Sequence, residues 1–199
     1  MKIYGDAISG NCLKVKWTCD YLGLAYEWVG IDLMKGETRS ADFLARNPAG
    51  QVPVLERDDG RCLAQSNAIM RYLALGSALI PADPYDAAKM DEWLFWEQYS
   101  HEPNIATLRF HMKYLGKGRA ARDPERVKRG IAALALMDAH LRTRAFFVAG
   151  GLTLADIALV AYTRMADEGG FALHPYAHVK DWIARVESLL GLAPYRPTP

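Results

Sequence analysis

The sequence contains few cysteines, and their number is odd. The three cysteines, Cys12, Cys19 and Cys62, have spacings that match neither a disulfide framework nor a zinc site. We therefore expect free thiols in a reducing compartment and no metal ion. No hydrophobic run approaches the roughly 20 residues that a membrane span needs. The N-terminus also lacks the hydrophobic stretch of a secretory signal, so we expect a soluble, cytoplasmic protein.

The chain has almost no excess of charge of either sign. Its 24 Lys and Arg residues against 23 Asp and Glu residues give a formal net charge of +1. This balance gives no electrostatic case for a nucleic acid or an anionic membrane as partner. Hydrophobic residues make up 51% of the 199 residues and charged residues 24%, which is typical of a globular protein with a sizeable core.

The first 76 residues alternate short strand-like and helix-like segments, which predicts an α/β domain. The expected order is βαβαββα. Asp59 and Gly60 supply the turn of a hairpin, Gly23 and Gly76 are suited to end helices, and Ser66 is expected to be an N-cap. The strands are expected over residues 1–5, 25–33, 52–55 and 61–64, and the helices over residues 12–23, 40–47 and 66–76.

Everything after a proline-containing linker at residues 77–86 has a helical pattern, so residues 87–199 are expected to form an all-α domain. Pro103 should bend or break its first helix near His101 or Glu102. Thr153 and Asp156 have the spacing of a capping box, with a shorter acid than the usual Glu or Gln. Residues 157–163 carry no charge, which predicts a buried central helix.

Ser9, Asn11 and Cys12 lie between the first strand and the first helix. Free backbone N–H groups and the helix dipole favour an anion there, and a thiolate is such an anion. The Ser9 hydroxyl and the Asn11 amide could each donate a hydrogen bond to it. Two other interpretations stay open: Ser9 and Asn11 simply cap the helix, or Cys12 is itself a redox nucleophile.

A second pair of motifs follows at residues 50–53 (GQVP) and 65–69 (QSNAI). If the Val52–Pro53 bond is cis, the backbone groups of Val52 could pair with an extended peptide ligand. Gln65 and Ser66 stand at another helix N-terminus, where a hydroxyl and N–H donors can hold a carboxylate. A simple turn and a simple N-cap are common separately, but they explain the pair less well.

These two motifs, the serine-containing loop before them and the helical second half with LTLADIAL together resemble a cytosolic glutathione transferase of bacterial, serine type. The resemblance implies a thioredoxin-like first domain that binds glutathione and a helical domain that lines the pocket of an electrophilic, largely apolar second substrate. It also implies a homodimer that uses glutathione as co-substrate in detoxification.

The resemblance assigns roles to particular residues. Ser9 would stabilise the thiolate, with Asn11 as helper or substitute. Val52 would bind the cysteinyl part of glutathione through its main chain, with Pro53 cis. The remaining assignments are Gln65 and Ser66 for the γ-glutamyl end, Lys35 and Gln51 for the glycyl carboxylate, and Trp96, Tyr99, Pro103 and Phe110 for the second-substrate pocket.

Two alternative functions stay open at this level. Cys12 lies near the position where some bacterial classes carry a catalytic cysteine, which would make the protein a glutathione-dependent disulfide oxidoreductase. The same fold also serves as a non-catalytic binding module.

Overall fold

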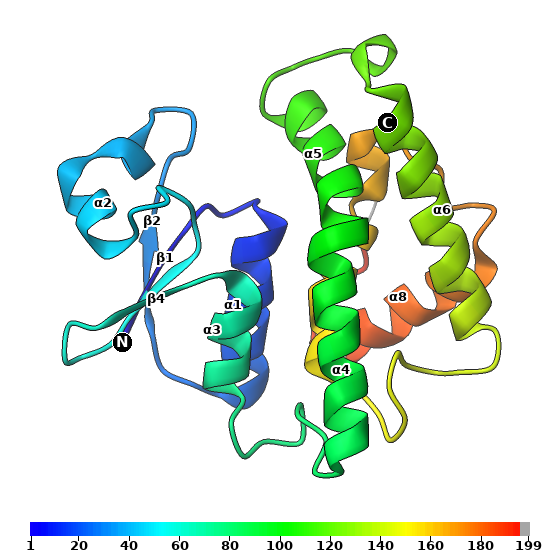
Figure 1. The fold of residues 1–199 in the computed structure, drawn as a ribbon, viewed down its shortest axis with the longest axis horizontal. Coiled ribbons are helices and arrows are strands. Elements are labelled where there is room, and N and C mark those ends of the chain that lie inside the picture. Colours follow the sequence, from blue (N-terminus) through cyan, green and yellow to red (C-terminus); the bar gives the residue numbers. More distant parts are fainter. Residues whose placement is uncertain (196–199) are drawn as a thin grey trace. The chain divides into compact units, whose positions relative to one another are not determined.

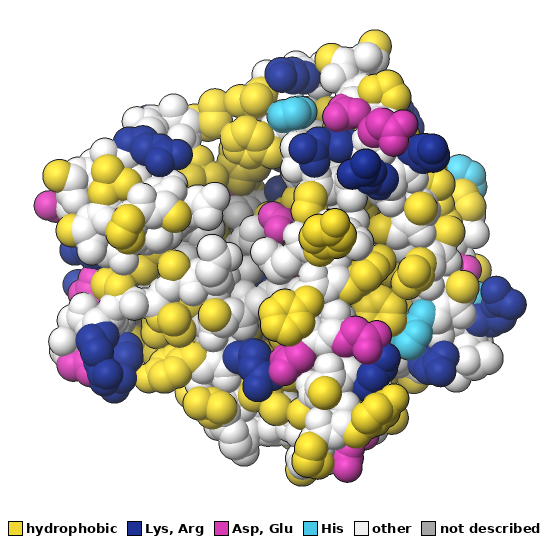
Figure 2. Space-filling model, in the orientation of Figure 1, with side chains coloured by type: hydrophobic (Ala, Val, Ile, Leu, Met, Phe, Trp, Pro, Cys, Tyr) yellow, Lys and Arg dark blue, Asp and Glu magenta, His cyan; other side chains and the backbone are white. Residues whose placement is uncertain are grey.

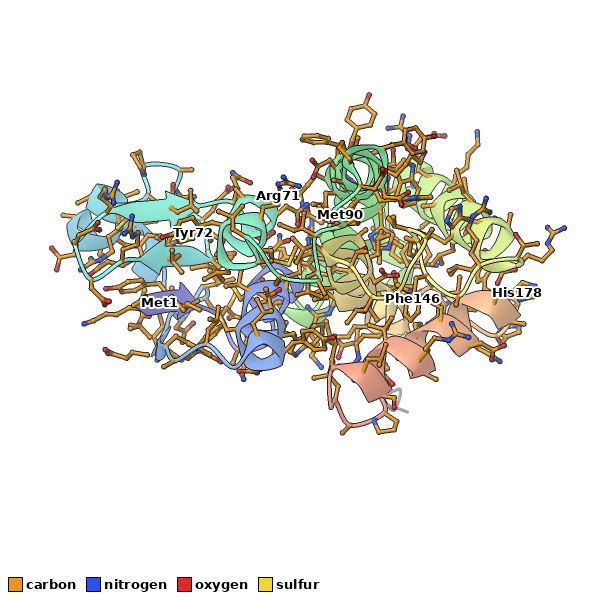
Figure 3. All side chains as sticks on the ribbon, turned by 90° about the horizontal axis from the view of Figure 1, so that it is seen from below. Met1, Arg71, Tyr72, Met90, Phe146 and His178 are labelled. Atoms are coloured by element: carbon orange, nitrogen blue, oxygen red, sulfur yellow. The ribbon has the colours of Figure 1, made fainter. Side chains whose placement is uncertain are left out.

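The computed structural model describes residues 1–195. The chain divides into two units, one of residues Met1–Ser77 and one that begins at Ala78. The first unit is a four-stranded mixed sheet with the strand order β2-β1-β3-β4. Strand β1 is parallel to β2 and antiparallel to β3, and β3 is antiparallel to β4. Within this unit, α1 and α3 cover one face of the sheet and α2 lies on the other (Figures 1 and 3).

The order of elements in this unit confirms the predicted βαβαββα pattern. Gly23 ends α1 in the left-handed conformation, with φ of 65°. A small core cluster of Tyr4, Phe43 and Val54 lies between the sheet and α2. The elements are β1 (Lys2–Gly5), α1 (Gly10–Leu22), β2 (Glu27–Gly30), the 3-10 helix η1 (Glu37–Arg39), α2 (Ala41–Arg46), β3 (Val54–Glu56), β4 (Cys62–Ala64) and α3 (Ser66–Leu73).

The prediction of Ser66 as an N-cap was wrong by one residue. Gln65 is the N-cap of α3, and Ser66 is already its first helical residue. Gln65 has φ of 70°, which is the one positive φ among the described residues other than glycine. A left-handed backbone is costly for glutamine, and nothing in its side chain signals the conformation. The helix also ends earlier than expected, at Leu73, with Ala74 as C-cap.

The second unit is all-helical. Helix α7 is buried along its whole length, which confirms the burial predicted from the lack of charge over residues 157–163. Helix α4 begins at Pro84, inside the stretch 77–86 that was expected to be linker. The elements are α4 (Pro84–Trp96), the π-helical turn η2 (Glu97–His101), α5 (Glu102–Lys113), the 3-10 helix η3 (Arg119–Ala121), α6 (Pro124–Leu141), α7 (Leu154–Thr163), the 3-10 helix η4 (Ala166–Gly169) and α8 (Ala177–Leu189).

Pro103 does not break the helical path. The five residues Glu97–His101 form a π-helical turn directly before α5, so α4 and α5 follow one another along the chain (Figure 1). Proline has no N–H to donate and its ring crowds the preceding turn, and a wider π turn accommodates both effects.

Hydrogen bonds to the Asp156 side chain hold α7 against the neighbouring segments. Its carboxylate accepts hydrogen bonds from the backbone N–H (2.9 Å) and the hydroxyl (3.0 Å) of Thr153, which confirms the predicted pairing of these two residues. It also accepts hydrogen bonds from the Phe147 N–H at 3.1 Å and the Trp182 indole Nε1–H at 3.0 Å. This one side chain therefore joins the loop before α7, α7 itself and α8. Among the described residues, no helix is both long and apolar enough to cross a bilayer.

Candidate active site

The turn between β1 and α1 is organised by an aspartate. Ser9 is the N-cap of α1 in extended conformation, but its side chain makes no capping hydrogen bond. Instead, Asp6 Oδ1 accepts the N–H groups of Ile8 at 2.9 Å and of Ser9 at 2.8 Å. The interpretation of Ser9 as a side-chain cap was therefore wrong. Sequence reasoning missed Asp6, although an aspartate two residues before a turn N–H is a common signal of such a loop.

Cys12 is unsuited to redox chemistry. Its side chain is fully buried, and its Sγ accepts the Asp6 N–H at 3.3 Å. Burial raises the pKa of the Cys12 thiol to about 12, while hydrogen bonds from the Ser9 side chain and the Asp6 backbone act weakly in the opposite direction. Because the thiolate is the reactive form, a protonated buried thiol at neutral pH is a poor nucleophile. The geometry does not favour disulfide exchange through Cys12.

A residue assigned to the sulfur of the ligand and one assigned to its γ-glutamyl end lie against each other. The Ser66 hydroxyl, at the start of α3, donates to Asn11 Oδ1 at 3.1 Å. Lys14 Nζ donates to the same oxygen at 2.8 Å. The first turns of α1 and α3 therefore meet at one point, although their residues are 55 positions apart in sequence. Lys14 was missed, because a lysine on a helix is usually a solvated residue.

The GQVP segment forms a loop directly before β3. The Val52–Pro53 peptide is cis, as the resemblance implies, and Gly50 has φ of 60°. Asn47 Nδ2 donates to the Gln51 carbonyl at 2.8 Å and holds the loop. Val52 precedes β3, whose pairing with β1 and β4 starts at Val54. The backbone of Val52 thus lies outside the strand ladder, where an extended ligand could pair with it.

Lys35 and Arg39 both follow β2 in the chain, and the sequence indicated the first of them but missed the second. Lys35 is 76% exposed and its Nζ already pairs with Asp32 at 3.2 Å. The Lys35 backbone N–H, and then its side chain, lower the pKa of the Asp32 carboxyl below its ordinary value. Arg39, at the end of η1, lies against the loop so closely that a Cβ at Gly50 would be 2.5 Å from its Nη1. Only glycine fits there with the guanidinium in place.

Comparisons with known proteins agree with this geometry. The family model described as "Glutathione S-transferase, N-terminal domain" matches residues 1–75, and "Glutathione S-transferase, C-terminal domain" matches residues 101–189. The chain belongs to the glutathione S-transferase family. Glutathione S-transferase 3 of Zea mays is 33% identical over 196 residues, which cover 92% of this chain and 86% of that protein.

Solved structures of the glutathione S-transferase family superpose closely on the chain. A glutathione S-transferase from Pseudomonas fluorescens is 46% identical with a TM-score of 0.91, and the match covers 94% of each chain. Another, from Xanthobacter autotrophicus, is 42% identical with a TM-score of 0.91 and covers 96% of this chain and 95% of that one. The thioredoxin-like and helical units are therefore those of a glutathione S-transferase.

The residues assigned to the second substrate of this glutathione S-transferase lie on α4, the π-helical turn and α5. Trp96 packs edge-on against Trp93, with ring centroids 5.1 Å apart. Tyr99 is 86% exposed, and Phe110 stacks on Tyr114. Pro103 lies in the first turn of α5. The described residues show no ring contact that joins the aromatic members, so their role in the pocket stays a prediction.

Proposed function

We propose that this glutathione S-transferase is of serine type, and that Ser9 stabilises the thiolate of bound glutathione. The observation that carries the proposal is the 3.1 Å contact between Ser66 and Asn11. It brings the expected γ-glutamyl site at α3 to the turn where a sulfur would lie. A single tripeptide could therefore reach both, with Val52 alongside its middle residue.

Each part of glutathione has a matching group. The N-terminus of α3, with Ser66 and the Gln65 side chain, suits the γ-glutamyl carboxylate and ammonium. The main chain of Val52 suits the cysteinyl amide. Gln51 suits the glycyl carboxylate, and Arg39 joins or replaces Lys35 there, because Arg39 lies against the Gly50 turn whereas Lys35 is paired with Asp32.

The chemistry is nucleophilic attack. Hydrogen bonding by Ser9 stabilises the ionised sulfur, its proton passes to solvent, and the sulfur then forms a bond to an electrophilic carbon as a leaving group departs or a double bond takes up the electron pair. One hydrogen bond to a charged group contributes about 1.5 to 3 kcal/mol, which corresponds to roughly 1 to 2 pKa units.

A titration tests this role of Ser9. The ultraviolet absorbance of the glutathione thiolate, measured against pH with enzyme in excess, gives the pKa of the bound thiol. We expect it to lie well below that of the free thiol in the wild type, and to rise by about 1 to 2 units in Ser9→Ala. Ser188→Ala, on the exposed side of α8, is the control and should change nothing. An identical titration in wild type and Ser9→Ala would refute the serine assignment.

A parallel assay separates the alternative activity. Conjugation to a chromogenic aryl halide should survive Cys12→Ser, and reduction of a mixed glutathione disulfide should be weak in both proteins. Loss of conjugation in Cys12→Ser with normal folding would instead favour the cysteine mechanism.

We also propose that two copies of the chain associate, and that the protein acts on apolar electrophiles in detoxification in the cytoplasm. Large hydrophobic side chains on α4 and the following turn are exposed, among them Phe95 and Tyr99. Hydrophobic side chains are visible on the surface of the helical unit (Figure 2). Tyr72, on α3, is also partly exposed, with the Arg57 guanidinium 5.8 Å from its ring centroid (Figure 3). Surfaces of this kind are typical of protein interfaces. Sedimentation velocity measures the oligomeric state directly.

A further inference from the structure

Lys14 is a buried cation that the proposed mechanism does not use. Its side chain has no exposed surface, although it lies in the second turn of α1, close to the turn that would hold the sulfur. Lysine is seldom fully buried unless its ammonium has partners that repay the loss of water. One partner is Asn11 Oδ1, at 2.8 Å from Lys14 Nζ.

This contact fixes which way the Asn11 carboxamide faces. An ammonium group has three N–H donors and no acceptor, so the atom that faces it must be the amide oxygen. The Ser66 hydroxyl reaches the same oxygen at 3.1 Å and must donate to it. With Oδ1 turned toward both donors, the two Nδ2–H donors point away from Lys14 and Ser66. The amide therefore has one orientation, and Lys14 selects it.

We propose that Lys14 is a positioning residue, which holds the Asn11 carboxamide with its Nδ2–H donors turned toward the sulfur of bound glutathione and links this group to Ser66. This inference rests on the proposed function, since it concerns the same glutathione site. Without the ammonium, the amide could rotate by 180° about its last bond. It would then place an oxygen where a thiolate needs a donor.

Two charged groups face the turn, and they act on a thiol there in opposite directions. Asp6 faces the turn from the end of β1, and Lys14 faces it from α1. Of these two, the Asp6 carboxylate raises the pKa of the neighbouring Cys12 thiol and the Lys14 ammonium lowers it, although burial dominates at that residue. A ligand sulfur at the turn would be exposed to the same two charges. Lys14 would therefore favour its ionised form by charge as well as by orienting Asn11.

The test compares two lysines of one helix. Lys14→Met removes the donor that selects the amide orientation. Lys16→Met removes a charge from the same helix at a residue that pairs with Asp20 at 2.6 Å. The readouts are the pKa of the thiol of bound glutathione and the dissociation constant for glutathione. For Lys14→Met we expect the thiol pKa to rise by about 1 unit, which is a tenfold fall in its ionisation constant, with a smaller change in affinity. Lys16→Met should match the wild type, and Lys14→Arg, which keeps N–H donors, should recover part of the effect.

The outcomes separate the two proposals. If wild-type protein fails to bind glutathione or to ionise it, the proposed function fails. If the wild type ionises glutathione and Lys14→Met behaves like Lys16→Met, only the role of Lys14 is overturned.

Asn11→Asp decides the matter if Lys14→Met does not fold. An aspartate still accepts hydrogen bonds from Lys14 and Ser66, so the melting temperature should be preserved. It has no donor for the sulfur, so the thiol pKa should rise by at least as much as in Lys14→Met. An unchanged thiol pKa in Asn11→Asp would overturn the inference.

Discussion

Replacing Asp156 should destabilise the protein strongly, because one carboxylate there accepts four hydrogen bonds in a fully buried site. In Asp156→Ala the N–H groups of Thr153 and Phe147 and the indole N–H of Trp182 lose their acceptor. An unsatisfied buried donor costs about 1 to 3 kcal/mol, and some donors will find other partners. We therefore expect a loss of about 4 kcal/mol, a large part of the roughly 5 to 15 kcal/mol that stabilises a typical domain.

Asp156→Asn should cost less, and the difference follows from which oxygen each donor uses. Phe147 and Trp182 donate to Oδ1, which asparagine keeps. Thr153 donates its N–H to Oδ2, which becomes an NH2 group that cannot accept it. The Thr153 N–H and the new NH2 group then face each other as two buried donors. We expect the free energy of unfolding to fall by about 2 kcal/mol.

Urea unfolding followed by circular dichroism measures these losses. Asp123→Asn is the matched control: Asp123 is the exposed N-cap of α6 and accepts the Glu125 N–H at 2.9 Å. Asparagine caps a helix about as well as aspartate, so its unfolding free energy should be unchanged. If Asp156→Ala cost no more than Asp123→Asn, the reasoning that the four bonds anchor α7 would be refuted.

Two further predictions concern the first unit. Gln65→Gly should raise the unfolding free energy by about 1 kcal/mol, because glycine adopts φ of 70° without strain, while weakening glutathione binding measured by calorimetry; a fall in both would contradict this. Glu56→Gln should alter how stability depends on pH. Hydrogen bonds from Arg46 and then Tyr4 lower the folded-state pKa of Glu56, so its contribution is present above its ordinary value of 4.5 and is lost as pH falls through the lowered folded pKa. The stability difference between wild type and Glu56→Gln should therefore shrink on acidification, and a difference constant from pH 7 to 3 would be inconsistent with this account.

Local patterns with a short-range physical cause were predictable from the sequence. Gly23 ends α1 because only glycine takes the left-handed conformation without cost. Thr153 donates to Asp156 because their spacing places both residues at the start of one helix. The cis Val52–Pro53 bond was implied by the resemblance to glutathione transferases, which the GQVP and QSNAI motifs carried.

Features that depend on tertiary contacts were not predictable. The positive φ of Gln65 moved the N-cap of α3 by one residue, and no property of glutamine signals such a backbone. Lys14 is buried and bound to an amide on the same helix, although its type and spacing suggest a solvated lysine. Arg39 lies against Gly50, eleven residues further along the chain, and no local pattern in the sequence signals this contact.

The π turn at Glu97–His101 has a consequence for the two helices that it joins. A π turn holds one residue more than an α turn, and each residue of an α-helix advances by about 100° around the axis. The surplus residue therefore offsets the phase of α5 against that of α4. Side chains of α5 point in directions that an uninterrupted helix would give to different positions. His101, whose Nε2 lies 2.9 Å from the Thr163 hydroxyl, reaches α7 from this offset turn. Deleting one residue from this turn would restore the α-helical hydrogen-bond pattern and rotate the side chains of α5 about the helix axis relative to those of α4.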